Sequence, residues 1–324
     1  MCTAITYHTK DHYFGRNLDI YTPCREQIII TPRNFPLRFR KVRDQEEHYA
    51  VIGMAYLAGD TPLYFDGTNE KGLSMAGLSF PENAVYKPEE AGMRSVAPFE
   101  LISWVLGQCA GVEEAEKLLE DVRLVDERFS SELPLTPLHW MIADRERVIT
   151  LEAVEEGLKI FDNPVGVLTN NPPFSFQMVY LNNFMGLTRD APTNRFCSSI
   201  PLEPYSLGMG AMGLPGDLSS PSRFVKAAFT KFNSVCGSSE WESVSQFFHI
   251  LGSVAQQRGC VQAGKDAYEM TYYTSCCNVD KGVYYYNTYN NSQITGVDLY
   301  RENLDGEKLV CYPLIDVQQI RMQN

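Results

Sequence analysis

Cys2 stands directly after the initiator methionine, where a cysteine can supply more than a thiol. A small second residue favours removal of Met1, which would leave Cys2 with a free α-amine. The reference pKa is about 8 for that amine and about 8.5 for the thiol, so one residue can provide both a nucleophile and a base. The thiolate is already strongly nucleophilic, and the position therefore suggests nucleophilic catalysis. Taken alone, however, a cysteine at position 2 is more often a coincidence.

Arg16 and Asp19 lie in the strand-like segment FGRNLD, downstream of a polar turn at 10–11. A hairpin at that turn would bring residues 15–19 back beside residues 2–6, so we expect both charges to face Cys2. An arginine lowers the pKa of a nearby thiol and can hold a substrate's negative charge, and an aspartate can anchor the α-ammonium. The alternative is an ordinary surface ion pair, which contributes little to stability.

The nine cysteines and five histidines do not form a metal or disulfide pattern. The cysteine count is odd, the spacings are irregular and no CxxC pair occurs. His8 and His12 have the spacing of helical metal ligands, but they lie in strand and turn sequence. Cys276 and Cys277 are adjacent in a strand-like run, where neighbours point to opposite faces. We therefore expect no metal and no cofactor, and a redox or metal protein has no support.

Charge and composition exclude several classes of partner. The chain has 324 residues, 44% of them hydrophobic and 21% charged, with a formal net charge of −12. This balance argues against nucleic acid, whose phosphates require a basic surface, and against an anionic membrane face. No apolar run approaches the roughly 20 residues of a membrane span, and the N-terminus lacks a signal-peptide pattern. A cytoplasmic location is the expectation.

The elements that must position these residues follow a recognisable order. Strand patterns alternate with pairs of helices, and Ser239 with Glu242 predicts a capping box at the start of the last helix. A tyrosine-rich stretch with a turn at 280–282 predicts a hairpin. This order indicates antiparallel sheets covered by helices. The strands are expected at 2–8, 27–32, 48–56, 62–66, 72–80, 138–144, 147–154, 157–162 and 268–289, and the helices at 99–110, 112–122, 222–235 and from 239 onward.

Several short segments form a specific pattern when they are taken together and in order: MCTAITY, FGRNLD, ITPRNF, NEKGLSMAGLSF, WVLGQC, DNPVGVLTNNP, GLPGDLSSPSRF and the CCN–KGVYYYNTY hairpin followed by NNSQIT. With these motifs the chain resembles, over essentially its whole length, the bacterial choloylglycine (bile salt) hydrolases, which are related to the penicillin V acylases. The resemblance implies one N-terminal-nucleophile hydrolase domain over 1–324, an α+β fold with a four-layer αββα sandwich. It also implies hydrolysis of the amide that links a steroid acid to glycine or taurine, without a cofactor.

Matching positions suggest roles for individual residues. The resemblance implies that Cys2 is the nucleophile, through a thioester, with Arg16 and Asp19 beside it. The TNN tripeptide supplies an asparagine for the oxyanion hole, and the spacing to Arg223 favours Asn170 over Asn171. Arg223 in SPSRF corresponds to a distant arginine of the site; without the resemblance it reads as a helix-surface residue.

Ser79 departs from the pattern of the family. Bile salt hydrolases often carry Asn at this position, and penicillin V acylases often carry Tyr. A hydroxyl can donate one hydrogen bond but reaches less far than an amide, so Ser79 is a possible oxyanion or substrate contact. The absence of Tyr favours bile salts. The alternatives are a penicillin V or N-acyl-amino-acid amidase with the same machinery, and a catalytically silent binding protein on the same fold.

A long connection at 187–212 carries few secondary-structure signals, and loops of that length are usually functional or used in assembly. In the family this region resembles one that clasps a neighbouring subunit, which implies a homotetramer. Its Gly208, Met209 and Gly210 resemble a Gly-x-Gly loop associated with a preference for taurine conjugates. The remaining candidates for substrate contact are apolar side chains that could equally be core residues: Leu18, Phe65 and Leu133.

Overall fold

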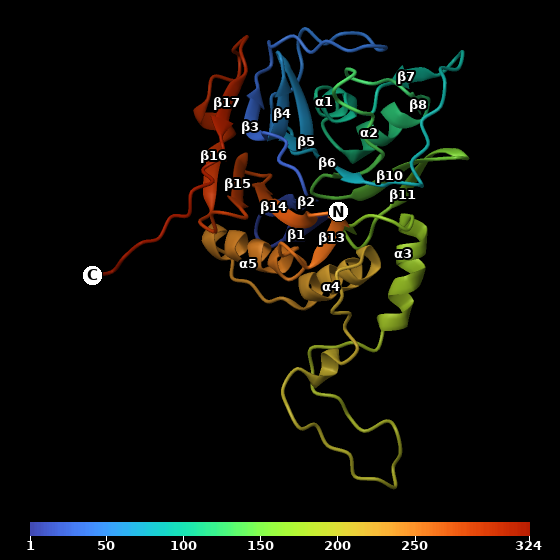
Figure 1. Cartoon of the computed structure of the whole chain (residues 1–324), viewed down its shortest axis with the longest axis vertical. Helices are drawn as coiled ribbons and strands as arrows, with labels where there is room; N and C mark the ends of the chain where they lie inside the picture. The colour runs from blue at the N-terminus through green and yellow to red at the C-terminus, as the bar shows by residue number, and fades with distance from the viewer.

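Two antiparallel sheets face each other in the computed structural model, which describes residues 1–324 (Figure 1). The first sheet has seven strands in the order β12-β1-β2-β14-β15-β16, and a short strand, β13, pairs with β14. The predicted hairpins at the N-terminus and in the tyrosine-rich region are confirmed within it. Its strands are β1 (Cys2–His8), β2 (His12–Ile20), β12 (Val167–Leu168), β13 (Val261–Gly264), β14 (Ala267–Asn278), β15 (Val283–Thr288) and β16 (Thr295–Asp298).

The second sheet has eight strands in the order β11-β10-β9-β6-β5-β4-β3-β17, so the last strand of the chain closes beside an early one. Seven of these strands match the runs predicted from alternating or apolar sequence, and only β17 was not predicted. A small parallel pair, β7 (Arg94–Val96) with β8 (Val122–Leu124), lies apart. The strands of the second sheet are β3 (Gln27–Thr31), β4 (Val51–Ala58), β5 (Thr61–Asn69), β6 (Ser74–Ser79), β9 (Leu138–Ala143), β10 (Val148–Val154), β11 (Gly157–Asp162) and β17 (Val310–Pro313).

Helices cover the outer face of each sheet, which gives the expected α+β, four-layer αββα sandwich (Figure 1). One buried apolar cluster of 37 residues joins the sheets to α4 and α5, and a second of 23 residues lies between the second sheet and α1 and α2. Burying one large aliphatic side chain contributes roughly 1.5–3 kcal/mol. The helices are α1 (Leu101–Leu106), α2 (Val112–Leu119), α3 (Phe174–Leu181), α4 (Ser220–Asn233) and α5 (Glu240–Gly252), with 3-10 turns η1 (Asn182–Phe184), η2 (Met209–Ala211) and η3 (Leu299–Arg301).

The helix boundaries correct two expectations. The predicted helix over 112–122 ends at Leu119, because Val122 already belongs to β8. The predicted helix over 99–110 is confined to Leu101–Leu106 and is followed by Gly107 as its C-cap. The predicted capping box of α5 is confirmed: Ser239 Oγ accepts from the Glu242 N–H, and the Glu242 carboxylate accepts from the Ser239 N–H.

The register of the first hairpin determines which side chains share a face with Cys2. Cys2 lies opposite Leu18, Ala4 opposite Arg16, and Thr3 opposite Asn17. Because side chains alternate along a strand, Arg16 shares the face of the Cys2 thiol, whereas Asp19 points to the opposite face. The hairpin does bring both charges back to the N-terminus, but not to the same side of the strand.

The connection at 187–212 extends away from the sandwich as a long loop, with η2 as its one regular turn (Figure 1). It leaves the sheets on the side of α3 and α4. No helix of the chain combines the length and apolar character needed to span a membrane.

Candidate active site

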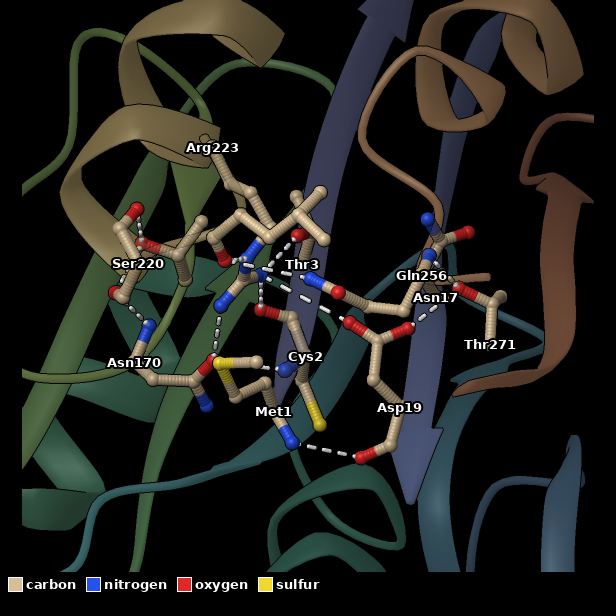
Figure 2. A network of polar contacts seen from close by, with 12 residues as sticks. Met1, Cys2, Thr3, Asn17, Asp19, Asn170, Ser220, Arg223, Gln256 and Thr271 are labelled. Atoms are coloured by element: carbon tan, nitrogen blue, oxygen red, sulfur yellow. Dashed lines mark hydrogen bonds and ion pairs between the residues drawn. The ribbon is translucent and has the colours of Figure 1, made fainter. Parts of the chain in front are cut away.

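Cys2 opens β1 with a side chain that is 3% exposed, and its backbone is held by two side chains from elsewhere in the chain (Figure 2). Its N–H donates to Asn170 Oδ1 at 2.7 Å. Its carbonyl oxygen accepts from Arg223 Nη1 at 2.6 Å. The position of the thiol is therefore fixed by the first turn of α4 and by the segment after β12, as well as by its own strand.

Asn170, rather than Asn171, touches Cys2. Its Oδ1 also accepts from Arg223 Nη2 at 2.7 Å, and its Nδ2 donates to the carbonyl oxygen of Ser79 at 2.7 Å. The backbone N–H of Asn170 donates to Ser220 Oγ at 2.8 Å, which fixes the asparagine against the start of α4. The Asn171 side chain instead donates to the carbonyl oxygen of Pro81. Ser79 reaches the site through its backbone.

Arg223 of α4 contacts both Cys2 and Asn170, although the sequence alone suggested a residue on the helix surface. It is buried, and besides Cys2 and Asn170 it donates to Thr3 Oγ1 at 2.6 Å and to the carbonyl oxygen of Leu218 at 3.1 Å. Burial lowers the pKa of Arg223, and the charges of Asp19 and Cys2 oppose that shift.

Asp19 lies beside Arg223 on the helix-covered face of β2. Its Oδ2 is 3.9 Å from Arg223 Nη1, and its Oδ1 accepts from Thr271 Oγ1 at 2.7 Å. Burial raises the pKa of Asp19, against the opposing effects of Arg223, the N-terminal ammonium and Thr271. Asp19 Oδ2 is buried without a hydrogen-bond partner, so it can accept one more donor.

Arg16 occupies the other face of β2, between the sheets. Its Nη1 donates to the carbonyl oxygens of Phe65 and Gly77 on the second sheet, and no carboxylate lies within ion-pair distance. Burial works against its charge, but the influence of Cys2, Tyr273 and Asp66 outweighs burial and raises the pKa of Arg16. Arg16 is therefore a buried cation without an ion-pair partner on the same face of the sheet as the Cys2 thiol.

A cavity of about 510 Å³ lies beside Gly77, whose carbonyl oxygen binds Arg16. Phe65 and Leu133 line it, whereas Leu18 packs in the core directly across from Cys2. A depression of about 870 Å³ at the far end of β1, around His8 and Lys231, is more polar. Cys2 lines neither of them, but Arg16 bonds to the carbonyl oxygens of two residues of the apolar cavity, Phe65 and Gly77. The apolar cavity is lined mainly by Tyr56, Leu63, Phe65, Phe99, Ile102, Phe129, Leu133, Leu135, Leu138 and Trp140.

Gly208, Met209 and Gly210 lie in the extended loop, away from the N-terminus (Figure 1). Gly208 has a φ of 83°, and a Cβ on Gly210 would lie 2.0 Å from the carbonyl oxygen of Asp190. Both glycines therefore shape the loop itself. The structure does not bring these three residues to the Cys2 of their own chain.

Met1 extends β1 by one residue and covers the backbone of Cys2 (Figure 2). Its carbonyl oxygen accepts from the Asp19 N–H at 2.9 Å, and its ammonium donates to the Asp19 carbonyl oxygen at 2.8 Å. The ammonium also forms an ion pair of 2.6 Å with Glu269 of β14. Sequence reasoning did not single out Glu269, Thr271 or Ser220, since each reaches the site only through long-range strand or helix packing.

No group of three or more potential metal-ligating side chains occurs, and all nine cysteines are free thiols. His8 and His12 stack with ring centroids 4.2 Å apart, at the end of the hairpin remote from Cys2.

A cysteine at the start of a central strand, on an αββα sandwich of two antiparallel sheets, defines the class of N-terminal-nucleophile hydrolases. The profile described as linear amide C–N hydrolases, choloylglycine hydrolase family, matches residues 2–312. The chain belongs to the choloylglycine hydrolase family.

Relatives and solved structures agree with this assignment. The chain is 54% identical, over 97% of each chain, to a protein of Lactiplantibacillus plantarum named bile salt hydrolase/transferase. It is 38% identical, over 96% of each chain, to a protein of Clostridium perfringens with the same name. The structure of a C2A mutant of conjugated bile acid hydrolase from Clostridium perfringens superimposes with a TM-score of 0.92 at 37% identity, covering all of both chains. Penicillin V acylase from Agrobacterium tumefaciens gives a TM-score of 0.75 at 18% identity over 98% and 94% of the chains, a likeness of fold.

Proposed function

We propose that this chain hydrolyses the amide bond of bile salts conjugated to glycine or taurine, through a thioester on Cys2 that forms once Met1 has been removed. The observation that carries the proposal is the cluster around Cys2: Asn170 and Arg223 bond to its backbone, Arg16 lies on the face of its thiol, and Asp19 lies beside Arg223 on the other face. The identity to proteins named bile salt hydrolases supports the choice of substrate.

Removal of Met1 would change the nitrogen of Cys2 from a peptide nitrogen into an amine. That amine can take the thiol proton, while Arg16 stabilises the resulting thiolate. Asp19 Oδ2, buried and without a partner, is an acceptor suited to the new ammonium. Asn170 Oδ1, which already accepts from this nitrogen at 2.7 Å, keeps it oriented.

The thiolate then attacks the amide carbon, and the oxygen of the tetrahedral intermediate needs donors. We assign this role to Asn170 Nδ2 together with backbone N–H groups near Ser79, because Asn170 spans the gap between Cys2 and Ser79. The Cys2 ammonium returns its proton to the departing nitrogen, and water hydrolyses the thioester. Arg223 holds Asn170 and the Cys2 carbonyl in place.

Intact mass before and after exposure to substrate tests this mechanism directly. We expect the processed chain to lack Met1 and to gain the mass of a bile acyl group during turnover, with release of one taurine or glycine per amide cleaved. A processed chain that neither acquires the adduct nor releases the amino acid would contradict the proposal and favour a binding protein.

The rival within the family is a penicillin V amidase with the same nucleophile. An apolar cavity of about 510 Å³ suits a steroid, and the side chain of Ser79 is not the tyrosine typical of the penicillin enzymes. Release of phenoxyacetate from penicillin V, measured beside release of taurine from taurocholate, separates the two. Faster turnover of penicillin V would reverse the assignment.

We also propose that four chains assemble through the loop at 187–212. Its large apolar side chains are exposed, with Leu207 fully exposed and Phe196 and Tyr205 more than four-fifths exposed, so a neighbouring chain can cover them. Light scattering that shows a monomer at micromolar concentration would refute the assembly. Cytoplasmic location is likewise our proposal, supported by nine free thiols that suit a reducing compartment.

The same assembly would bear on the preference for taurine proposed for Gly208, Met209 and Gly210. These residues lie away from the Cys2 of their own chain, so any contact with substrate must be made in a neighbouring subunit. Equal or faster turnover of glycocholate than of taurocholate would remove this preference.

A further inference from the structure

Met1 lies at the end of β1 against the backbone of Asp19 and the carboxylate of Glu269, and these polar groups, called the notch below, match both ends of an amino acid. The Asp19 N–H lies 2.9 Å from the Met1 carbonyl oxygen. The Asp19 carbonyl oxygen and Glu269 Oε2 accept from the Met1 ammonium at 2.8 and 2.6 Å. The contact is partly buried, and the side chain of Glu269 is 16% exposed. Removal of Met1 leaves all three groups without these partners.

The nitrogen released from the substrate has to lie close to this notch. For the Cys2 amine to protonate that nitrogen, the two must come within hydrogen-bond reach, about 2.6–3.2 Å. Met1 is covalently attached to the nitrogen of Cys2, so its backbone occupies space next to the atom that delivers the proton. The leaving amino acid needs the same space.

We infer that the notch occupied by Met1 is, in the processed chain, a subsite for a free amino acid in its zwitterionic form, with Glu269 binding the ammonium. This inference rests on the proposed function. Free glycine has the same sequence of atoms as the Met1 backbone, an ammonium, one carbon and a carboxyl group. Its carboxylate can accept from the Asp19 N–H, while its ammonium contacts Glu269 and the Asp19 carbonyl oxygen. Taurine offers the same ammonium and a sulfonate on a longer chain.

The subsite would act in both directions of the acyl transfer. During hydrolysis it receives the amino acid as it leaves. In reverse, an amino acid bound there gives one ammonium proton to the Glu269 carboxylate, and its nitrogen forms a C–N bond with the thioester carbon. The C–S bond breaks, the second proton of the nitrogen passes to the departing thiolate, and the amide is restored. An amino acid can thus compete with water for the same thioester.

The ratio of amide to free bile acid formed from one thioester measures that competition, whatever the rate of acylation. We would supply taurocholate with either glycine or hydroxylamine as the competing nucleophile near neutral pH, where glycine carries an ammonium and hydroxylamine is mostly uncharged. Glu269→Gln should lower the ratio for glycine roughly tenfold or more, since it removes a charge-assisted hydrogen bond, and should leave the ratio for hydroxylamine unchanged.

Asp266→Asn is the matched control, because it removes one carboxylate from the exposed turn of the same hairpin, with no contact to Met1. If Asp266→Asn lowers the glycine ratio as much as Glu269→Gln does, the effect comes from long-range charge. If Glu269→Gln lowers the ratios for glycine and hydroxylamine equally, the substitution disturbs the site in general. Either result overturns the subsite, and so does an unchanged ratio for glycine. If Glu269→Gln does not fold, the processed Cys2→Ala chain should still gain thermal stability with glycine and not with methylamine. Absence of that difference also refutes the subsite. Absence of any Cys2 adduct with bile salts would instead refute the proposed function.

Discussion

The two sheets meet around Cys2 and contribute different things. The first sheet, with α4 and the segment after β12, supplies charged and amide side chains that are buried and bonded to one another, as between Arg223 and Asn170. The second sheet supplies carbonyl oxygens for Arg16 and the apolar walls of the cavity. Under the proposed function, the chemistry would depend on a few exact polar contacts, whereas substrate binding would be spread over many apolar ones. Substitutions on the two sides should therefore differ in kind as well as in size.

The largest effects are expected at Cys2. Cys2→Ala removes the nucleophile, Cys2→Ser leaves a much weaker one, and retention of any residue ahead of Cys2 converts the amine into a non-basic amide. Each should lower bile salt turnover by about 10⁴-fold or more, in line with loss of the nucleophile in other hydrolases. All three should fold, because Ala and Ser are no larger than the buried cysteine they replace and a retained Met1 already has bonding partners at the end of β1. Full activity in a mass-verified chain that retains Met1 would rule out the amine as base.

Asn170→Ala should come next, because it removes an oxyanion donor and the acceptor for the Cys2 nitrogen. We expect kcat to fall by about 10²–10³-fold, with a smaller change in KM. Asn171→Ala is the matched control, since its side chain bonds only to Pro81. The measurement is the steady-state kcat and KM of both variants. A larger fall in kcat for Asn171→Ala than for Asn170→Ala would assign the oxyanion role to Asn171 instead.

Phe65→Ala tests the other sheet. The side chain lines the apolar cavity, so its loss should weaken binding of the steroid by an amount comparable to burial of one large side chain, about 1.5–3 kcal/mol, or roughly tenfold or more in kcat/KM. The change should appear mainly in KM. A fall in kcat alone would show that Phe65 acts through Arg16, whose guanidinium donates to its carbonyl oxygen.

Ser79→Asn should maintain or raise turnover of bile salts, because the longer amide adds a donor near Asn170. The gain is bounded by the roughly 2.7–4 kcal/mol that one oxyanion donor contributes elsewhere. Turnover of a variant with an unchanged melting temperature is the measurement. A large loss of rate would identify a function of the Ser79 hydroxyl that the present contacts do not show.

Glu100→Gln should change stability alone. Burial raises the pKa of Glu100 to about 7 from an ordinary value of 4.5, because its Oε2 is buried without a partner. Between those two values the folded chain holds a proton that the unfolded chain has lost, so the free energy of unfolding falls as pH rises. The variant should lose this dependence. The test is to measure the melting temperature of the unsubstituted chain and of Glu100→Gln below pH 4.5 and above pH 7. The same change in melting temperature with pH in both proteins would contradict the prediction.

Local sequence was sufficient for the hairpin that carries Cys2 and Arg16. Its two strands are adjacent in the chain, and the turn at 10–11 fixes their pairing. The same reasoning placed Asp19 on the wrong face, because the register of the pairing was not considered residue by residue. Thr271 could not be found, since a bulge between Thr271 and Tyr273 turns Thr271 toward Asp19.

Distant segments were accessible only through resemblance. Arg223 lies in a helix whose pattern gives no sign that one arginine is buried, and only the family motif singled it out. Glu269 lies in none of the motifs, and Ser220 lies in GLPGDLSSPSRF without being singled out there; their contacts depend on how β14 and α4 pack against the end of β1. The short strand β12 and the helix α3 were also missed, because their apolar runs are too brief to show a period.

The strand pairing of Met1 has a consequence for how much of a preparation is active. Once the chain has folded, both the carbonyl oxygen and the ammonium of Met1 are hydrogen-bonded to Asp19. Glu269 also forms an ion pair with this ammonium, which an aminopeptidase must bind. If Met1 is removed as proposed, we expect its removal to be fast only on the nascent, unfolded chain, so that folding competes with it. Slower translation or more abundant aminopeptidase should raise the catalytically competent fraction, whereas rapid overexpression should yield well-folded molecules that never become enzymes.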